Sequence, residues 1–156
     1  MIKEPNDYSI VASARGQKVL SYEFVGGYEG DWLLVSADAS TVYFYKGCYG
    51  SCTGCDQLES VFGYGWNEKT DSIKEQEIKD FAASYKSFIE IDKYDLREMM
   101  REFNDAETQN IWLVGLVQLL PANFRNEWLK KEPGKIVLDI TLANIARAIK
   151  NELKEK

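Results

Sequence analysis

The chain changes character at residues 45–56, which read Tyr45-Lys46-Gly47-Cys48-Tyr49-Gly50-Ser51-Cys52-Thr53-Gly54-Cys55-Asp56. This stretch contains all three cysteines of the protein and three of its eleven glycines. Before it, apolar residues alternate as they do in strands, and from residue 72 onward they recur at helical spacing. We therefore expect the stretch to be a glycine-containing connection between a sheet and a set of helices.

Upstream of this connection the pattern predicts an antiparallel sheet. Residues 18–25 form a half-buried strand in which Leu20, Tyr22 and Phe24 share one face, while Val19, Ser21 and Glu23 share the other. Further strands are predicted at residues 31–36 and 41–46, which are rich in β-branched and aromatic residues, and a first strand at residues 8–14. Short connections, such as the turn at residues 38–40, make neighbouring strands antiparallel.

Downstream the pattern is helical. We predict a short helical turn with Leu58, Val61 and Phe62 inward, and a helix over residues 72–90 with Ser72-Ile73-Lys74-Glu75 as its capping box. A second helix begins at Asp92 or Tyr94. Others are expected at 106–120 and 121–131 and at the C-terminus, which carries Leu142, Ile145, Ala146, Ile149 and Leu153. For 106–120 periodicity does not separate a buried helix from a buried strand, although length favours a helix.

These patterns predict one α+β domain spanning residues 1–156. It has an N-terminal antiparallel sheet of three or four strands followed by four or five helices. A chain of 156 residues is a usual size for one domain, and neither half could bury its apolar face alone.

Composition narrows the class of partner. The formal net charge of −6 has the opposite sign to that of a nucleic-acid binder, so no direct DNA or RNA contact is expected. The longest apolar run, residues 111–117, is shorter than the ~20 residues that cross a bilayer, and residues 1–7 lack the apolar core of a signal peptide. We expect a soluble cytoplasmic protein without a membrane partner.

The chain contains no histidine. This excludes catalysis by Ser-His-Asp or Cys-His sets and the His-Glu-x-x-His zinc motif. The glycine-rich phosphate-binding patterns Gly-x-x-x-x-Gly-Lys-Ser/Thr and Gly-x-Gly-x-x-Gly are absent as well. A protein that is not an enzyme is therefore expected.

Four interpretations compete for Cys48, Cys52 and Cys55. Their Cys-x3-Cys-x2-Cys spacing resembles the cluster-binding signature of radical S-adenosylmethionine enzymes, but the repeated strand–helix units of those enzymes are missing. A structural zinc site takes four ligands, so Asp56, another carboxylate or a second chain would have to complete it. The Cys52-Thr53-Gly54-Cys55 run is also a CxxC redox pattern that opens a helical turn. Free cysteines that pack as small apolar residues are the fourth interpretation.

Five aromatic residues gather around the predicted sheet and the connection: Trp32, Tyr45, Tyr49, Tyr64 and Trp66. Those that are buried belong to the core. Any that are exposed would form a protein-binding surface, because Tyr and Trp dominate interface hot spots.

The run Tyr49-Gly50-Ser51-Cys52-Thr53-Gly54-Cys55-Asp56, after an aromatic-rich strand, resembles a Gly-Ser-Cys-x-Gly-Cys-Asp signature of small uncharacterised proteins of bacteria and their phages. The resemblance covers about residues 28–60 and implies a mobile-element origin, with no activity attached.

The leading hypothesis is a non-enzymatic, acidic, cytoplasmic protein-interaction module, phage-encoded and acting on a host protein, without a cofactor. The alternative is a small zinc-binding or CxxC redox protein that uses Cys52 and Cys55. A self-assembling component, with the apolar residues 111–117 in a homo-oligomer interface, is a third hypothesis.

Overall fold

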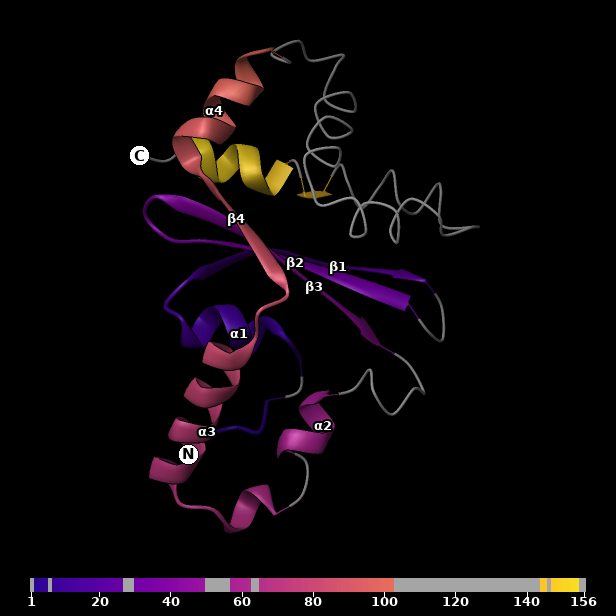
Figure 1. Cartoon of the computed structure of the whole chain (residues 1–156), viewed down its shortest axis with the longest axis vertical. Helices are drawn as coiled ribbons and strands as arrows, with labels where there is room; N and C mark the ends of the chain where they lie inside the picture. Colours follow the sequence, from indigo (N-terminus) through magenta and orange to yellow (C-terminus); the bar gives the residue numbers. More distant parts are fainter. Residues whose placement is uncertain are drawn as a thin grey trace.

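A computed structural model describes residues 2–5, 7–26, 30–49, 57–62, 65–102, 144–145 and 147–154. It contains a four-stranded antiparallel sheet in the order β1-β2-β3-β4, with helices on both sides (Figure 1). The elements along the chain are α1 (Ser9–Ala14), β1 (Lys18–Gly26), β2 (Gly30–Ala37), β3 (Thr41–Tyr49), α2 (Gln57–Phe62), η1 (Trp66–Glu68), α3 (Asp71–Ser84), β4 (Phe88–Asp92) and α4 (Lys93–Glu102). Residues 144–145 and 147–154 are helical too.

The α+β class and the antiparallel sheet are confirmed, but the predicted order of elements is wrong in two places. One helix precedes the sheet, and the fourth strand follows α3 instead of standing among the first strands. The described helices and strands are therefore interleaved, and the sheet is completed only after the chain has passed through α3.

The two central strands are buried on both faces. Residues opposite each other in an antiparallel pair point to the same face. Leu34 lies opposite Tyr45 and Val35 lies opposite Phe44, and none of the four is more than 1% exposed. Because adjacent residues of a strand point to opposite faces, both faces must be covered.

Each face has its own helical layer (Figure 1). On the face of Leu34, residues of α1, α2, η1 and α3 form a buried cluster with residues of β2 and β3 and with Tyr8, which precedes α1. Its members are Tyr8, Val11, Ala12, Trp32, Leu34, Tyr45, Leu58, Phe62, Trp66 and Phe81. The opposite face carries α4 and the C-terminal helical residues, with Leu96, Ile145, Ile149 and Leu153 buried. The predicted C-terminal amphipathic helix is confirmed for the described residues, whereas Leu142, Ala146 and the expected helices at 106–120 and 121–131 lie outside them.

The predicted strand at 8–14 is wrong, because residues 9–14 form α1. The Asp7 carboxylate accepts a hydrogen bond from the Ser9 backbone N–H at 2.9 Å, which orders the start of the helix. Val11 and Ala12 are buried one turn after Tyr8, which is helical spacing. The helix ends at Ala14, and the chain turns at Gly16, whose φ of +76° is a left-handed conformation that favours glycine.

The predicted helix over 72–90 is correct at its start and wrong at its end. It begins after Thr70, whose hydroxyl accepts from the Ile73 N–H at 3.3 Å, so the cap lies two residues before the predicted Ser72. It ends at Ser84, and residues 88–92 pair with β3 as strand β4. The run Phe88-Ile89-Glu90-Ile91 suits a strand as well as a helix. It forms a strand because its backbone pairs with β3.

Two smaller predictions, on the start of the second long helix and on the inward residues of α2, are corrected as well. The second long helix begins at Lys93, between the predicted Asp92 and Tyr94, and the Asp92 carboxylate accepts from the Tyr94 N–H at 2.7 Å. In α2 the predicted inward set holds for Leu58 and Phe62, but the side chain of Val61 is 44% exposed. In the part of the chain that the structure describes, every helix is too short or too polar to cross a bilayer.

Candidate functional site

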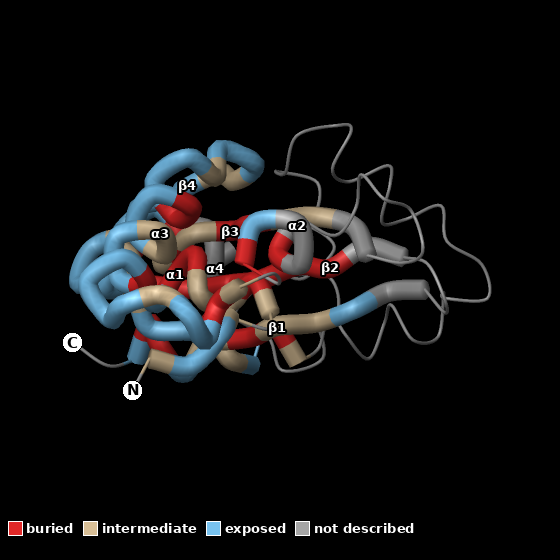
Figure 2. Tube along the Cα trace, turned by 90° about the horizontal axis from the view of Figure 1, so that it is seen from below, coloured by how far each residue is buried: buried red, intermediate tan, exposed pale blue. Residues whose placement is uncertain are grey.

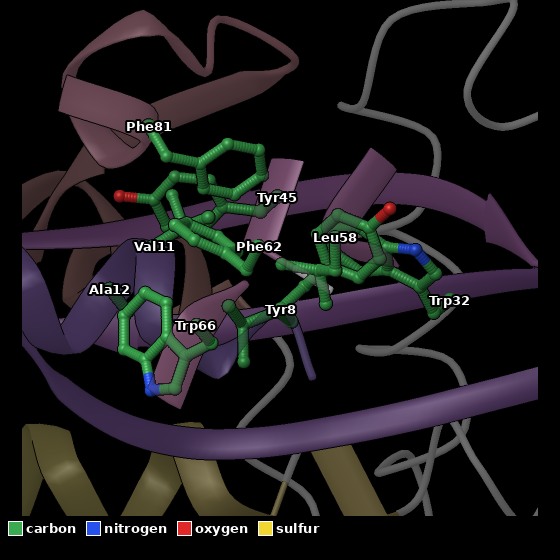
Figure 3. Close-up of a cluster of buried hydrophobic side chains, with 10 residues drawn as sticks. Tyr8, Val11, Ala12, Trp32, Tyr45, Leu58, Phe62, Trp66 and Phe81 are labelled. Carbon is green, nitrogen blue, oxygen red and sulfur yellow. The ribbon is translucent and has the colours of Figure 1, made fainter. Parts of the chain in front are cut away.

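Three of the five aromatic residues considered for a binding surface belong to the core. Trp32, Tyr45 and Trp66 are 1%, 0% and 3% exposed, and Figure 3 shows them among the buried side chains. They therefore cannot form the expected protein-binding surface, and the core interpretation holds for these three. The Tyr49 side chain and all of Tyr64 lie outside the described residues.

Trp32 is fixed by close neighbours on every side. Its ring stacks on Tyr8 with 4.5 Å between centroids, and Tyr22 meets it edge-on at 5.8 Å. Gly47 lies opposite Trp32 in β3, and a Cβ at that position would overlap the indole. The glycine that the sequence suggested as a turn residue is thus a strand residue, and its missing side chain makes room for the ring.

Tyr45 takes part in a polar network that joins the sheet to α3. Its hydroxyl donates to Gln17 Oε1 at 2.7 Å, and the Arg15 guanidinium lies 3.2 Å from the same hydroxyl. Arg15 also donates to the backbone carbonyls of Ala82 and Tyr85, at 2.5 and 2.8 Å. A cation at the C-terminal end of a helix satisfies carbonyls that have no partner within it. We interpret this network as structural, because these hydrogen bonds of Arg15 all join it to other parts of the same fold.

The predicted metal or redox residues fall almost wholly outside the described part of the chain. The backbone of Cys48 lies in β3, opposite Asp31, but its side chain is not described, and Cys52, Cys55 and Asp56 lie beyond the described residues. Within the described ranges no three His, Cys, Asp or Glu side chains come together as a metal site would require. The zinc, cluster and redox interpretations of these residues stay predictions.

A buried ion cluster holds the C-terminal helical residues against the sheet. The Glu152 carboxylate lies 2.8 Å from Lys93 Nζ and 3.1 Å from Lys18 Nζ. The Lys93 ammonium, and to a lesser degree that of Lys18, lowers the pKa of Glu152. Arg97 adds a hydrogen bond to the Leu153 carbonyl at 3.1 Å.

The strand β1 forms one edge of the sheet and differs from the interior strands in its exposure. Figure 2 shows it on one side of the described strands, and in the described residues it pairs only with β2. Val19 is 36% exposed and Phe24 is 47% exposed, which is a large accessible surface for apolar side chains. An edge strand presents backbone N–H and C=O groups to a possible additional strand.

A register shift in β1 rearranges its two faces. Val19 lies opposite Ser36, whereas Tyr22 and Phe24 lie opposite Leu34 and Trp32, and the shift falls between Val19 and Ser21. Because Trp32, Leu34 and Ser36 share a face of β2, Val19, Tyr22 and Phe24 share the same face of β1. Simple alternation placed Val19 on the opposite face, which is wrong.

The opposite face of β1 carries charge. By the same register, Lys18 lies opposite Ala37 and Glu23 opposite Leu33, so both belong to the face that the C-terminal helical residues cover. The Ser21 hydroxyl donates to Glu23 Oε2 at 3.3 Å, as expected for two residues on one face. The edge therefore has an apolar side, with Val19 and Phe24, and a charged side, with Lys18 and Glu23.

The sequence pattern predicts the strand but not its place at the edge of the sheet, and it contains no signal for the register shift. Comparison of the chain with protein-family models, with curated proteins and with solved structures gives no match.

Proposed function

We propose that this chain is a protein-binding module and that β1 is its contact element, which pairs with an extended segment of another chain. The observation that carries this proposal is the coincidence, on one edge strand, of nine residues of backbone with two exposed apolar side chains, Val19 and Phe24, on one face. In strand addition the backbone hydrogen bonds supply affinity, and alternate side chains supply specificity.

The rest of the sheet offers less to a partner. Both faces of β2 and β3 are covered by helices, which leaves the two edges. The other edge, β4, has five residues, and α4 begins at the residue that follows it. A partner strand therefore has nearly twice the length of backbone to pair with at β1.

The partner's identity is a separate question from the binding mode. The resemblance of residues 49–56 to phage and bacterial proteins supports a host protein as partner, and the acidic composition, with a net charge of −6, suits a basic one. Both belong to the proposal. The zinc-binding or redox alternative rests on the cysteines alone and gains no support from the described contacts.

The test compares variants that differ only in where a charge is placed. Immobilised protein is exposed to a bacterial lysate, and the bound proteins are identified by mass spectrometry for the wild type, Phe24→Lys and Ile73→Lys. Ile73 is 50% exposed on α3, away from the β1 edge, which makes it the matched control. We expect Phe24→Lys to lose the bound protein and Ile73→Lys to retain it. Equal retention by both variants, with unchanged circular dichroism, would contradict the role of β1.

A further inference from the structure

We infer that the segment which adds to β1 carries a lysine or arginine opposite Glu23, between two apolar residues that lie against the other face of the strand. The inference rests on the proposed function and specifies the sequence that the contact element selects. It is carried by the Glu23 carboxylate, which lies on an edge strand and has no cation within ion-pair distance among the described residues. The added segment would supply that cation.

Glu23 is half-buried, and its contact is local. Its Oε2 accepts a hydrogen bond at 3.3 Å from the hydroxyl of Ser21, which belongs to the same face of β1. The two oxygens of a carboxylate offer about four acceptor positions, so one long hydrogen bond leaves most of this capacity unused. Because a half-buried charge is screened less by salt than an exposed one, an ammonium or guanidinium placed here would be attracted effectively.

The stretch of chain from β1 to β2 is acidic. Residues 18–37 include three acidic residues, Glu23, Glu29 and Asp31, and one basic residue, Lys18. The excess has the same sign as the net charge of −6 of the whole chain. Charge of one sign around a binding element favours approach of the opposite sign, so both the residue and its surroundings select a basic segment.

The residues next to Glu23 set the rest of the pattern. From Ser21 to Phe24, β1 pairs with β2 without a further register shift, so its side chains alternate there. Tyr22 and Phe24 therefore flank Glu23 on the opposite face, and Phe24 is 47% exposed. Residues directly opposite each other across two strands point to the same face. A segment with a basic residue opposite Glu23 thus places its two neighbours against aromatic rings, where apolar side chains are favoured.

A charge swap between the protein and a synthetic peptide tests the inference. The probe is a fluorescently labelled peptide with blocked ends, Ser-Thr-Thr-Val-Lys-Val-Thr-Thr-Ser, which has nine residues like β1. A second peptide has glutamate in place of the lysine. Fluorescence anisotropy measures the binding of each peptide to the full chain as wild type, Glu23→Lys and Glu90→Lys. Glu90 is exposed on β4, the opposite edge of the sheet, so Glu90→Lys makes the same change in net charge away from β1.

We expect the wild type to bind the lysine peptide about tenfold or more tightly than the glutamate peptide, because opposite charges directly across two strands attract and like charges repel. Glu23→Lys should reverse this order and bind the glutamate peptide more tightly, which also shows that the variant is folded. Glu90→Lys should keep the wild-type order. Recovery of binding when both charges are exchanged identifies a direct pair, as in a double-mutant cycle.

The inference is overturned if Glu23→Lys keeps the wild-type order, if Glu90→Lys reverses the order as strongly as Glu23→Lys does, or if the lysine peptide does not bind the wild type at about 1 mM. Phe24→Lys separates this failure from failure of the proposed function. If the two peptides bind equally and Phe24→Lys removes both, strand addition at β1 stands and only the selection of charge is rejected. If Phe24→Lys removes neither, β1 itself is rejected as the contact element.

Discussion

At the scale of single residues, Gly47 is the position where the smallest change has the clearest consequence. The ring of Trp32 is 1% exposed and stacked on Tyr8, so it has no space into which to move. A methyl group at residue 47 would overlap ring atoms Cζ2, Cε2 and Nε1 of Trp32. We expect Gly47→Ala to lower the free energy of unfolding by about 1–3 kcal/mol, as overpacking of a core does, measured by urea denaturation.

The control is the same substitution in a Trp32→Val background. The smaller side chain leaves room for the added methyl group, so the cost of Gly47→Ala should largely disappear there. Equal costs in both backgrounds would mean that the backbone of residue 47, and not the indole, is what requires glycine.

Tyr43 and Asp38 form a second residue-scale pair with a measurable titration. The Tyr43 hydroxyl donates to Asp38 Oδ2 at 2.6 Å, and this hydrogen bond, with burial, raises the pKa of Tyr43 to about 12. The same bond lowers the pKa of Asp38. We expect Asp38→Asn to bring the pKa of Tyr43 down toward the ordinary value of 10.0, since the phenolate would no longer face a carboxylate.

The measurement is the carbon-13 chemical shift of Tyr43 Cζ between about pH 9 and about pH 12, the range in which tyrosines titrate. Asp80→Asn, an exposed change on α3, is the control and should leave the titration of Tyr43 where it is. An unchanged Tyr43 titration in Asp38→Asn would show that the carboxylate is not the cause.

At the scale of one element, two residues are candidates for the N-cap of α3. The sequence pattern selects Ser72, whereas in the structure the Thr70 hydroxyl accepts the Ile73 N–H. Thr70→Ala should lower the free energy of unfolding by about 1 kcal/mol, as loss of an N-cap does, and Ser72→Ala should change it by only a few tenths. Chemical denaturation of the two variants measures this difference. A larger loss of unfolding free energy in Ser72→Ala than in Thr70→Ala would show that Ser72 is the cap after all.

In α3, the burial of two neighbouring residues does not follow their hydrophobicity. Its buried face begins at Lys74, which is 5% exposed and whose ammonium lies 5.5 Å from the Trp66 ring centroid, while Ile73 is 50% exposed. A lysine can bury its methylene stem against an aromatic ring and keep its charge at the rim. Hydrophobicity alone would exchange these two neighbours, because it does not register the aromatic ring against which the lysine stem packs. The predicted inward set of this helix is confirmed, since Phe81 and Ala82 are buried and Ile78 packs against the same core.

At the scale of the whole molecule, Glu152 joins the C-terminal helical residues to β1 and α4. Its folded-state pKa lies below the ordinary value of 4.5, so its contribution to stability is complete above that value and is lost as the pH falls through the lowered pKa. Glu152→Gln should therefore lower the free energy of unfolding by about 2 kcal/mol at neutral pH, as for a hydrogen bond to a charged group. The difference from the wild type should shrink on acidification below about pH 4.5.

Urea denaturation at a series of pH values from about 7 to about 3 measures this difference. Glu75→Gln, an exposed change on α3, is the control and should follow the wild type throughout. A Glu152→Gln difference that did not depend on pH would show that the carboxylate acts through its shape and not through its charge.

Local sequence was sufficient where a residue's neighbours in the chain decide its structure. The turn at 38–40 follows from the Asp38 carboxylate, which accepts from the N–H groups of Ser40 and Thr41. The strands β1, β2 and β3 and their antiparallel arrangement follow from periodicity and short connections. The absence of histidine and the sign of the net charge are likewise properties of the sequence alone.

Tertiary contacts decided the rest, because the competing local structures are close in free energy. Residues 88–91 form a strand because their backbone pairs with the edge of β3. Trp32, Tyr45 and Trp66 are buried because helices cover the sheet. The register shift in β1 depends on pairing with β2, and it places Lys18 and Glu23 on one face. The sequence by itself therefore determined the strands and their antiparallel arrangement, while the edge that we propose as the binding site exists only through the pairing of distant segments, which no local pattern encodes.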